Sequence, residues 1–278
     1  SAAATVIMDL TVEAEAFGAE IVFPENEVPS VSGRLLADEA AIETLEIPAL
    51  NKGRIAQYLK ANMLTAKNIT DRPVLAGCIG PYSLAGRLYD MSEIMVGIYI
   101  EPDVVKTLLD KCTAYITAYC RELKAIGATG VIMAEPAAGL LSNEDCQEYS
   151  TVYVRQIVEA VQDENFAVIL HNCGNKGQCT QAMIDSGAVA LHFGNAVNMV
   201  ETLEQCPSDL IVMGNIDPVG ILKQATSEEV YRITADLLSK TSQYKNFVIS
   251  SGCDMPPLVP DANIKAFYQA IADFNTGK

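Results

Sequence analysis

Residues 166–174 read Phe-Ala-Val-Ile-Leu-His-Asn-Cys-Gly, a short apolar run that ends in polar residues and a glycine. A run this short and this apolar is typical of a strand buried on both faces, as in a parallel sheet. Polar residues directly after such a strand lie where parallel α/β folds bind their ligands. This stretch therefore predicts both a class of fold and the place of a functional site.

Six further runs of the same kind join Phe166–His171, and each is bounded by Gly, Pro, Asn or Asp. They lie at Thr5–Leu10, Pro73–Ile79, Gly130–Glu135, Ala188–Phe193, Leu210–Asn215 and Asn246–Ser251. Helical patterns fill the gaps: residues 102–126 begin with Pro102, and Thr226 with Glu229 has the spacing of a capping box. Strand and helix alternate regularly, which predicts a parallel sheet with right-handed crossovers.

A further apolar segment, Ala19–Phe23, would raise the count to eight, the number of strands that closes a barrel. Only about eight residues separate it from Thr5–Leu10, whereas a parallel crossover needs about a dozen. We therefore expect a hairpin-like excursion over residues 19–33. Seven parallel strands in a chain that begins inside a strand indicate a (β/α)8 TIM-type barrel. Its first N-terminal βα unit is expected to be missing, and residues 1–278 are expected to form one domain.

The composition disfavours nucleic-acid-binding and membrane proteins. The chain has 278 residues, of which 50% are hydrophobic, and a formal net charge of −16. Such a chain can bury a sizeable core, and its acidic surface disfavours nucleic acids and anionic membranes as partners. Apolar runs stay far below the ~20 residues of a transmembrane helix, and a signal peptide is not recognisable. We expect a cytoplasmic protein whose eight cysteines are reduced thiols.

Polar side chains follow every predicted strand, and both histidines of the chain are among them. This concentration at the carboxyl ends of the strands predicts an active site there. The candidates are Asp9, Tyr82, Ser83, Glu135, His171, Cys173, His192, Asn215, Asp217 and Cys253.

His171 and Cys173 form the most informative pair, because residues two apart on an extended segment point to the same side. Cys253, after the last predicted strand, supplies a third group. One imidazole and two thiolates suit Zn²⁺ with an open fourth position. A thiol bound there loses its proton, while the two cysteine thiolates keep it nucleophilic, which favours alkyl transfer to sulfur. The alternative is that Cys173 is an inert thiol buried in a turn.

The carboxylates of Asp9, Glu135 and Asp217 are candidate catalytic groups, as proton acceptors, substrate anchors or displaceable zinc ligands. Each can instead cap a helix or form a turn, and Asp217-Pro218 is a good turn pair. His192 is a substrate contact or a structural histidine. The other candidate substrate-binding residues are Tyr82, Ser83 and Asn215.

The chain resembles the uroporphyrinogen decarboxylase superfamily, and within it the methylcobamide:coenzyme M methyltransferase branch. The stretches that carry the likeness are 10–18, 29–31, 80–86, 135–142, 171–174, 214–218 and 251–256. The resemblance implies a β/α barrel and a zinc-dependent transfer of a methyl group from a methylcorrinoid to a thiol. It places the zinc ligands at His171, Cys173 and Cys253, and it matches Asp9 to the essential aspartate of the decarboxylases.

These features together favour a methyltransferase that takes the methyl group from methylcobalamin on a corrinoid protein and gives it to a small thiol such as coenzyme M. A second hypothesis is a decarboxylase of a tetrapyrrole, which needs cationic side chains for the substrate carboxylates. Only Arg87 lies near the predicted strand ends. A third is a non-catalytic zinc- or corrinoid-binding module, in which a fourth protein ligand would close the zinc site.

Overall fold

The computed structural model describes residues 1–25 and 27–277. Seven strands form one parallel sheet, in the order β1-β4-β5-β6-β7-β8-β9, as the sequence predicted. The strands are β1 (Ala4–Thr5), β4 (Val74–Ile79), β5 (Gly130–Ala134), β6 (Ala167–Asn172), β7 (Ala190–Phe193), β8 (Ile211–Ile216) and β9 (Phe247–Ser251).

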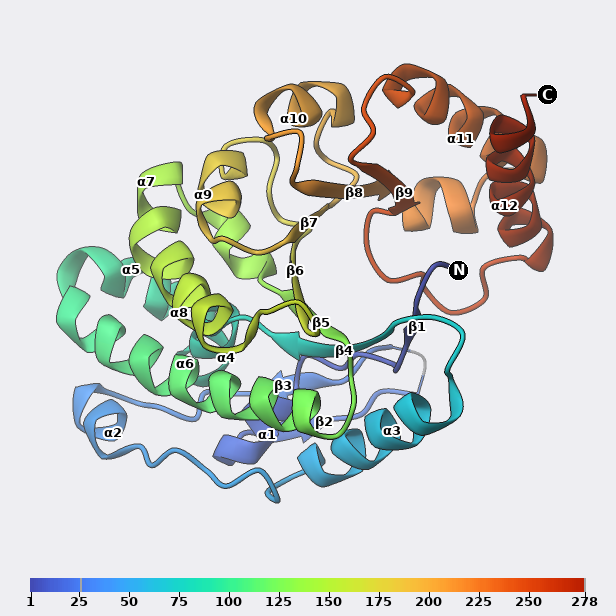
Figure 1. The fold of residues 1–278 in the computed structure, drawn as a ribbon. Helices are drawn as coiled ribbons and strands as arrows, with labels where there is room; N and C mark the ends of the chain where they lie inside the picture. Colours follow the sequence, from blue (N-terminus) through green and yellow to red (C-terminus); the bar gives the residue numbers. More distant parts are fainter. Residues whose placement is uncertain (26, 278) are drawn as a thin grey trace.

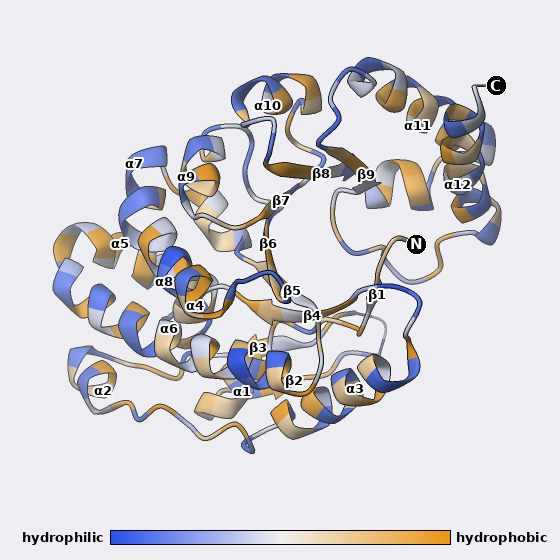
Figure 2. Ribbon diagram, viewed as in Figure 1, coloured by the Kyte–Doolittle hydropathy of each residue, from blue (hydrophilic) through white to orange (hydrophobic). Residues whose placement is uncertain are grey.

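The sheet curls about a common axis with helices around its outer face, which is the α/β arrangement of a TIM-type fold (Figure 1). β1 and β9 are the two edges of the sheet in the described part of the chain. Strands β4, β5 and β6 are almost entirely buried. Burial on both faces explains why these runs are continuously apolar, and Figure 2 shows apolar strands among helices with mixed surfaces.

The first strand is shorter than expected. The prediction of a strand over Thr5–Leu10 is wrong beyond Thr5, because only Ala4 and Thr5 pair with β4. The chain turns at Asp9, whose Oδ1 accepts a hydrogen bond from the backbone N–H of Thr11, and helix α1 (Val12–Phe17) follows at once. The apolar residues around Ile7 mimic a strand, but the turn ends the pairing early.

Within the expected excursion, β2 (Glu20–Val22) pairs antiparallel with β3 (Ser30–Ser32). Residue 26, which falls inside that excursion, lies outside the described residues. The hairpin stands apart from the parallel sheet as a separate two-stranded unit.

The long helices follow the predicted patterns. Helix α6 (Pro102–Ala125) starts at its proline and buries one apolar stripe, and α11 (Ser227–Thr241) carries the capping box of Thr226 and Glu229. The other helices are α2 (Glu39–Thr44), α3 (Ile55–Asn68), α4 (Pro81–Tyr89), α5 (Met91–Ile100), α7 (Asn143–Cys146), α8 (Val152–Val161), α9 (Thr180–Asp185), α10 (Met199–Gln205) and α12 (Asp261–Thr276). Shorter helical turns are η1 (Pro136–Leu140), η2 (Gln147–Thr151) and η3 (Pro218–Lys223). Among the described helices, none has the length and apolarity needed to span a bilayer.

All eight cysteines are free thiols, in agreement with the reduced state expected from the sequence. Six are buried, and the two that are partly exposed are Cys173 and Cys253. Since buried thiols behave as small apolar groups, the two accessible ones are the candidates for chemistry.

Candidate metal centre

His171, Cys173 and Cys253 lie together at the carboxyl end of the sheet. His171 is near the end of β6, Cys173 follows that strand, and Cys253 follows β9. One ring nitrogen and the two Sγ atoms all lie within 4.8 Å of one another. Ligand atoms this close need only small side-chain adjustments to reach a common ion, and the set of one imidazole and two thiols fits tetrahedral zinc with one open position.

Glycines allow the two cysteines to meet although β7 and β8 lie between their strands. The loop after β7 passes between them, and its backbone packs directly on both neighbours. A Cβ atom on Gly194 would lie 2.8 Å from Cα of Cys173, and one on Gly252 would lie 2.6 Å from the backbone nitrogen of Asn195. Real side chains do not fit at such distances, so the loop stacking depends on glycine at both positions.

The two thiols are electrostatically unequal. The neighbouring thiol of Cys173, and secondly the ring of His171, hold the pKa of Cys253 below its usual range. Of the two thiols, Cys253 is therefore the one that ionises first. Thiolate is the form that binds metals, so this environment prepares the cluster for a cation.

His192 lies next to His171 on the neighbouring strand β7. Its Nδ1 is 2.7 Å from Nδ1 of His171, and its Nε2 is 2.8 Å from Oγ of Ser250 and 2.9 Å from the carbonyl oxygen of Ser251. Burial, and secondly His171, lower the pKa of His192 to about 3, so its ring is neutral at physiological pH. Both nitrogens of this expected substrate contact are directed at protein atoms.

A cavity of about 560 Å³ opens beside the three clustered side chains. This volume falls in the range of small-molecule sites, and its walls are mainly apolar. The residues that line it include Val6, Met8, Ala76, Ile132, Ile169, Met213, His171, Cys173, His192 and Cys253.

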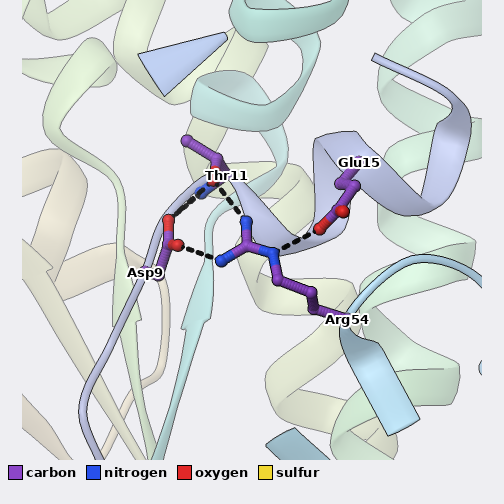
Figure 3. Close-up of polar contacts among 4 residues, drawn as sticks. All are labelled: Asp9, Thr11, Glu15 and Arg54. Carbon is purple, nitrogen blue, oxygen red and sulfur yellow. Dashed lines mark hydrogen bonds and ion pairs between the residues drawn. The ribbon is translucent and has the colours of Figure 1, made fainter. Parts of the chain in front are cut away.

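Asp9 is not among the described residues that line this cavity, and a polar network engages its carboxylate (Figure 3). Its Oδ1 accepts hydrogen bonds from the N–H and hydroxyl of Thr11, and its Oδ2 pairs with Nη1 of Arg54. Arg54 also pairs with Glu15 of α1 through Nε. Burial acts to raise the pKa of Asp9, but the hydrogen bonds from Arg54 and Thr11 outweigh it and hold the pKa below its ordinary value. Asp9 is consequently an ionised, fully engaged carboxylate.

The other two acidic candidates cap helices. Glu135 is buried, and its two oxygens accept hydrogen bonds from the backbone N–H groups of Tyr82 at 2.7 Å and Ser83 at 2.8 Å, in the first turn of α4. Asp217 accepts from the N–H groups of Val219 and Gly220, both at 2.9 Å, at the start of η3. These are the capping roles that the sequence left open.

The three remaining candidates are not among the described residues that line the cavity. Tyr82 is fully buried, and Ser83 accepts a hydrogen bond from the N–H of Ala137. Asn215 donates to the carbonyl oxygens of Gly194 at 3.0 Å and Val197 at 2.9 Å, which anchors the loop after β7. The contacts named here are with the framework around the cluster, and the assignment of the three residues to substrate binding stays a prediction.

Sequence reasoning missed Arg54 and Ser250. Arg54 lies 45 residues from Asp9 and precedes helix α3, so no local spacing connects the two. Ser250 lies on β9 and reaches His192 on β7, across β8. A polar residue near the end of a buried strand was the one signal available for Ser250.

Comparisons with known proteins agree with this picture. The family model described as Uroporphyrinogen decarboxylase (URO-D) matches residues 2–274. A methylcobamide:CoM methyltransferase from Methanosarcina acetivorans is 28% identical over 276 residues, which are 98% of this chain and 80% of that protein. A uroporphyrinogen decarboxylase from Legionella pneumophila is 25% identical over 281 residues, with 98% and 79% covered. A solved methyltransferase structure from Methanosarcina mazei has a TM-score of 0.89 at 25% identity, over 99% of this chain and 81% of that one.

Proposed function

The chain belongs to the uroporphyrinogen decarboxylase family, and from this premise we propose that it is a zinc-dependent methyltransferase. It would move a methyl group from a methylated corrinoid, carried by a partner protein, to a small thiol such as coenzyme M. The observation that carries the proposal is the cluster of His171, Cys173 and Cys253 beside a mainly apolar cavity. The relatives named methylcobamide:CoM methyltransferases support the same donor and acceptor.

His171, Cys173 and Cys253 are the residues that would hold the metal. When bound there, zinc lowers the pKa of an acceptor thiol while the two cysteine thiolates keep that sulfur electron-rich. The described cluster contains three ligands, which leaves a position for the acceptor. A structural zinc site has four protein ligands, so a site with three favours an enzyme over a non-catalytic zinc-binding module.

The cavity walls would orient the reacting groups and keep water away from them. Side chains such as Met8, Ile132 and Ile169 surround the space next to the cluster, so a thiolate there would be poorly hydrated. A thiolate that has lost its water is a stronger nucleophile toward a methyl carbon held in line with it. The walls thus suit transfer of an alkyl group better than hydrolysis.

The same walls argue against a tetrapyrrole decarboxylase. A substrate with several carboxylates needs cationic partners, and the described residues lining the cavity include no lysine or arginine. Asp9, which matches the decarboxylase aspartate, is engaged by Arg54 and Thr11. The catalytic roles expected of Asp9, Glu135 and Asp217 stay predictions, and the contacts described above favour a part in holding the loops and helices of the site.

The test is methyl transfer from free methylcobalamin to a panel of thiols, with the zinc-loaded protein and the cobalamin spectrum as readout. We expect demethylation with at least one small thiol. We also expect Cys253→Ser to lose zinc and activity while its circular dichroism stays unchanged. Cys206→Ser, which alters a buried thiol next to α10, is the matched control and keeps its zinc. Turnover by metal-free protein, or full zinc content in Cys253→Ser, would contradict the proposal.

A further inference from the structure

His192 is built into the sheet so that it meets the ring edge of His171. The two ring centroids are 4.6 Å apart at an interplanar angle of 41°. Nδ1 of His171 faces two atoms of the same residue, Nδ1 of His192 at 2.7 Å and the backbone carbonyl oxygen of His192 at 3.2 Å. The far nitrogen of His192 ends at β9, between Ser250 and Ser251.

Carbonyl oxygens only accept hydrogen bonds, and this fixes where the protons lie. Nε2 of His192 is 2.9 Å from the carbonyl oxygen of Ser251, so this nitrogen carries hydrogen and donates it. Nδ1 of His171 also faces a carbonyl oxygen, that of His192 at 3.2 Å, so it is the donor of the 2.7 Å contact between the two Nδ1 atoms and Nδ1 of His192 is the acceptor. The hydroxyl of Ser250 fits this order, because it can donate to the carbonyl of Ser251 at 3.0 Å and accept from Nε2.

The same rule applies to His171. Its Nδ1 faces two acceptors, the carbonyl oxygen and Nδ1 of His192, so this nitrogen carries its hydrogen. In the neutral imidazole form that a metal binds, Nε2 is then the nitrogen of His171 with the free lone pair. Two carbonyl groups, on β7 and β9, therefore lead independently to one consistent arrangement of protons.

We propose that His192 is a positioning residue, which accepts the Nδ1–H of His171 and so presents Nε2 of His171 to the metal. The inference rests on the proposed metal site, and it assigns His192 no contact with the reacting atoms. Metal-bound histidines depend on such a partner for both tautomer and ring orientation, and its loss lowers metal affinity about 10–100-fold. Here the partner is a second imidazole, held in turn by the end of β9.

The first experiment reads the tautomers directly. The chain has only two histidines, so long-range ¹H–¹⁵N spectra of the metal-free wild-type protein at neutral pH contain two imidazole patterns. We expect His171 to carry hydrogen on Nδ1 and His192 on Nε2. The opposite tautomer at either residue would overturn the proposal, and no variant is needed to see it.

The second experiment measures zinc affinity by competition with a chromophoric chelator. His192→Phe keeps a planar ring without an acceptor, and we expect its affinity to fall about 10–100-fold. His192→Asn places an amide oxygen near the former Nδ1, and we expect it to recover most of that loss. Unchanged zinc affinity in His192→Phe would overturn the inference. Equal losses of zinc affinity in His192→Phe and His192→Asn, both with native circular dichroism, would also overturn it.

The outcome separates this inference from the proposed function. Wild-type affinity in both His192 variants, with normal methyl transfer by the wild type, would refute only the positioning role. A graded loss of zinc from Asn to Phe, in a protein that transfers no methyl group to any thiol, would support the positioning role and refute the methyltransferase.

Discussion

The network around Arg54 gives a sharp prediction about stability. Its guanidinium joins the loop after β1, through Asp9, to helix α1, through Glu15, and it lies 4.8 Å from the ring centre of Phe23 in the hairpin segment. Replacement by methionine keeps much of the apolar stem but removes every one of these polar contacts. Asp9 would then be a carboxylate with a single partner, Thr11.

The expected cost follows from burial. The side chain of Asp9 is 8% exposed and that of Arg54 is 23% exposed, so the pair lies between a buried and a surface ion pair. Breaking a buried pair costs about 3–5 kcal/mol, and breaking a surface pair costs about 0–1 kcal/mol. We therefore expect Arg54→Met to lower the free energy of unfolding by about 2 kcal/mol at pH 7.

Urea denaturation followed by circular dichroism measures this change. The control is Arg72→Met, because Arg72 pairs with Asp71 on the surface, with side chains 39% and 63% exposed, and no measurable change is expected there. Combining Arg54→Met with Asp9→Asn should cost less than the sum of the single changes, since each removes the same ion pair. Equal stability of Arg54→Met and wild type, or strict additivity in the double variant, would refute the reasoning.

Two further predictions concern Glu13 and Gly252. Burial raises the pKa of Glu13 from 4.5 to about 7, so the folded protein retains a proton that the unfolded chain loses, and stability falls as the pH rises through this interval. Glu13→Gln lacks that loss and should gain about 3 kcal/mol relative to wild type between pH 4 and pH 8; parallel urea midpoints at the two pH values would contradict this. Gly252→Ala should lower zinc affinity at least about 10-fold, because its methyl group cannot fit beside the backbone of Asn195 and must displace the loop of Cys253. Cys206→Ser is again the control for chelator competition, and equal affinities of Gly252→Ala and this control would show that the loops do not need to stack.

The sequence was most informative where chemistry and secondary structure coincide in one short segment. The parallel strands could be predicted because burial on both faces leaves a continuous apolar run, as in β6. His171, Cys173 and Cys253 could be grouped because parallel strands end at the same edge of the sheet. Whether these residues bind zinc stays a prediction that the assays above address.

Other features depend on contacts that no local pattern records. The end of β1 is determined by the turn at Asp9, and the engagement of Asp9 by Arg54 joins residues far apart in the chain. The orientation of His192 depends on backbone carbonyls, which every residue possesses, so residue identity alone cannot reveal it. The capping role of Glu135 could not be predicted for the same reason, because its partners are backbone N–H groups of α4.

The position of the cluster across β6 and β9 has a mechanical consequence. A metal bound by both Cys173 and Cys253 would cross-link a loop of about 80 residues that contains β7 and β8. Such a cross-link lowers the conformational entropy of the unfolded chain and so stabilises the folded state. β9 is an edge strand of the described sheet, paired on one side with β8. The ion would therefore hold this edge strand to the middle of the sheet. Local unfolding of β9 and the helix that follows it, measured by hydrogen exchange, should be slower when the metal is bound.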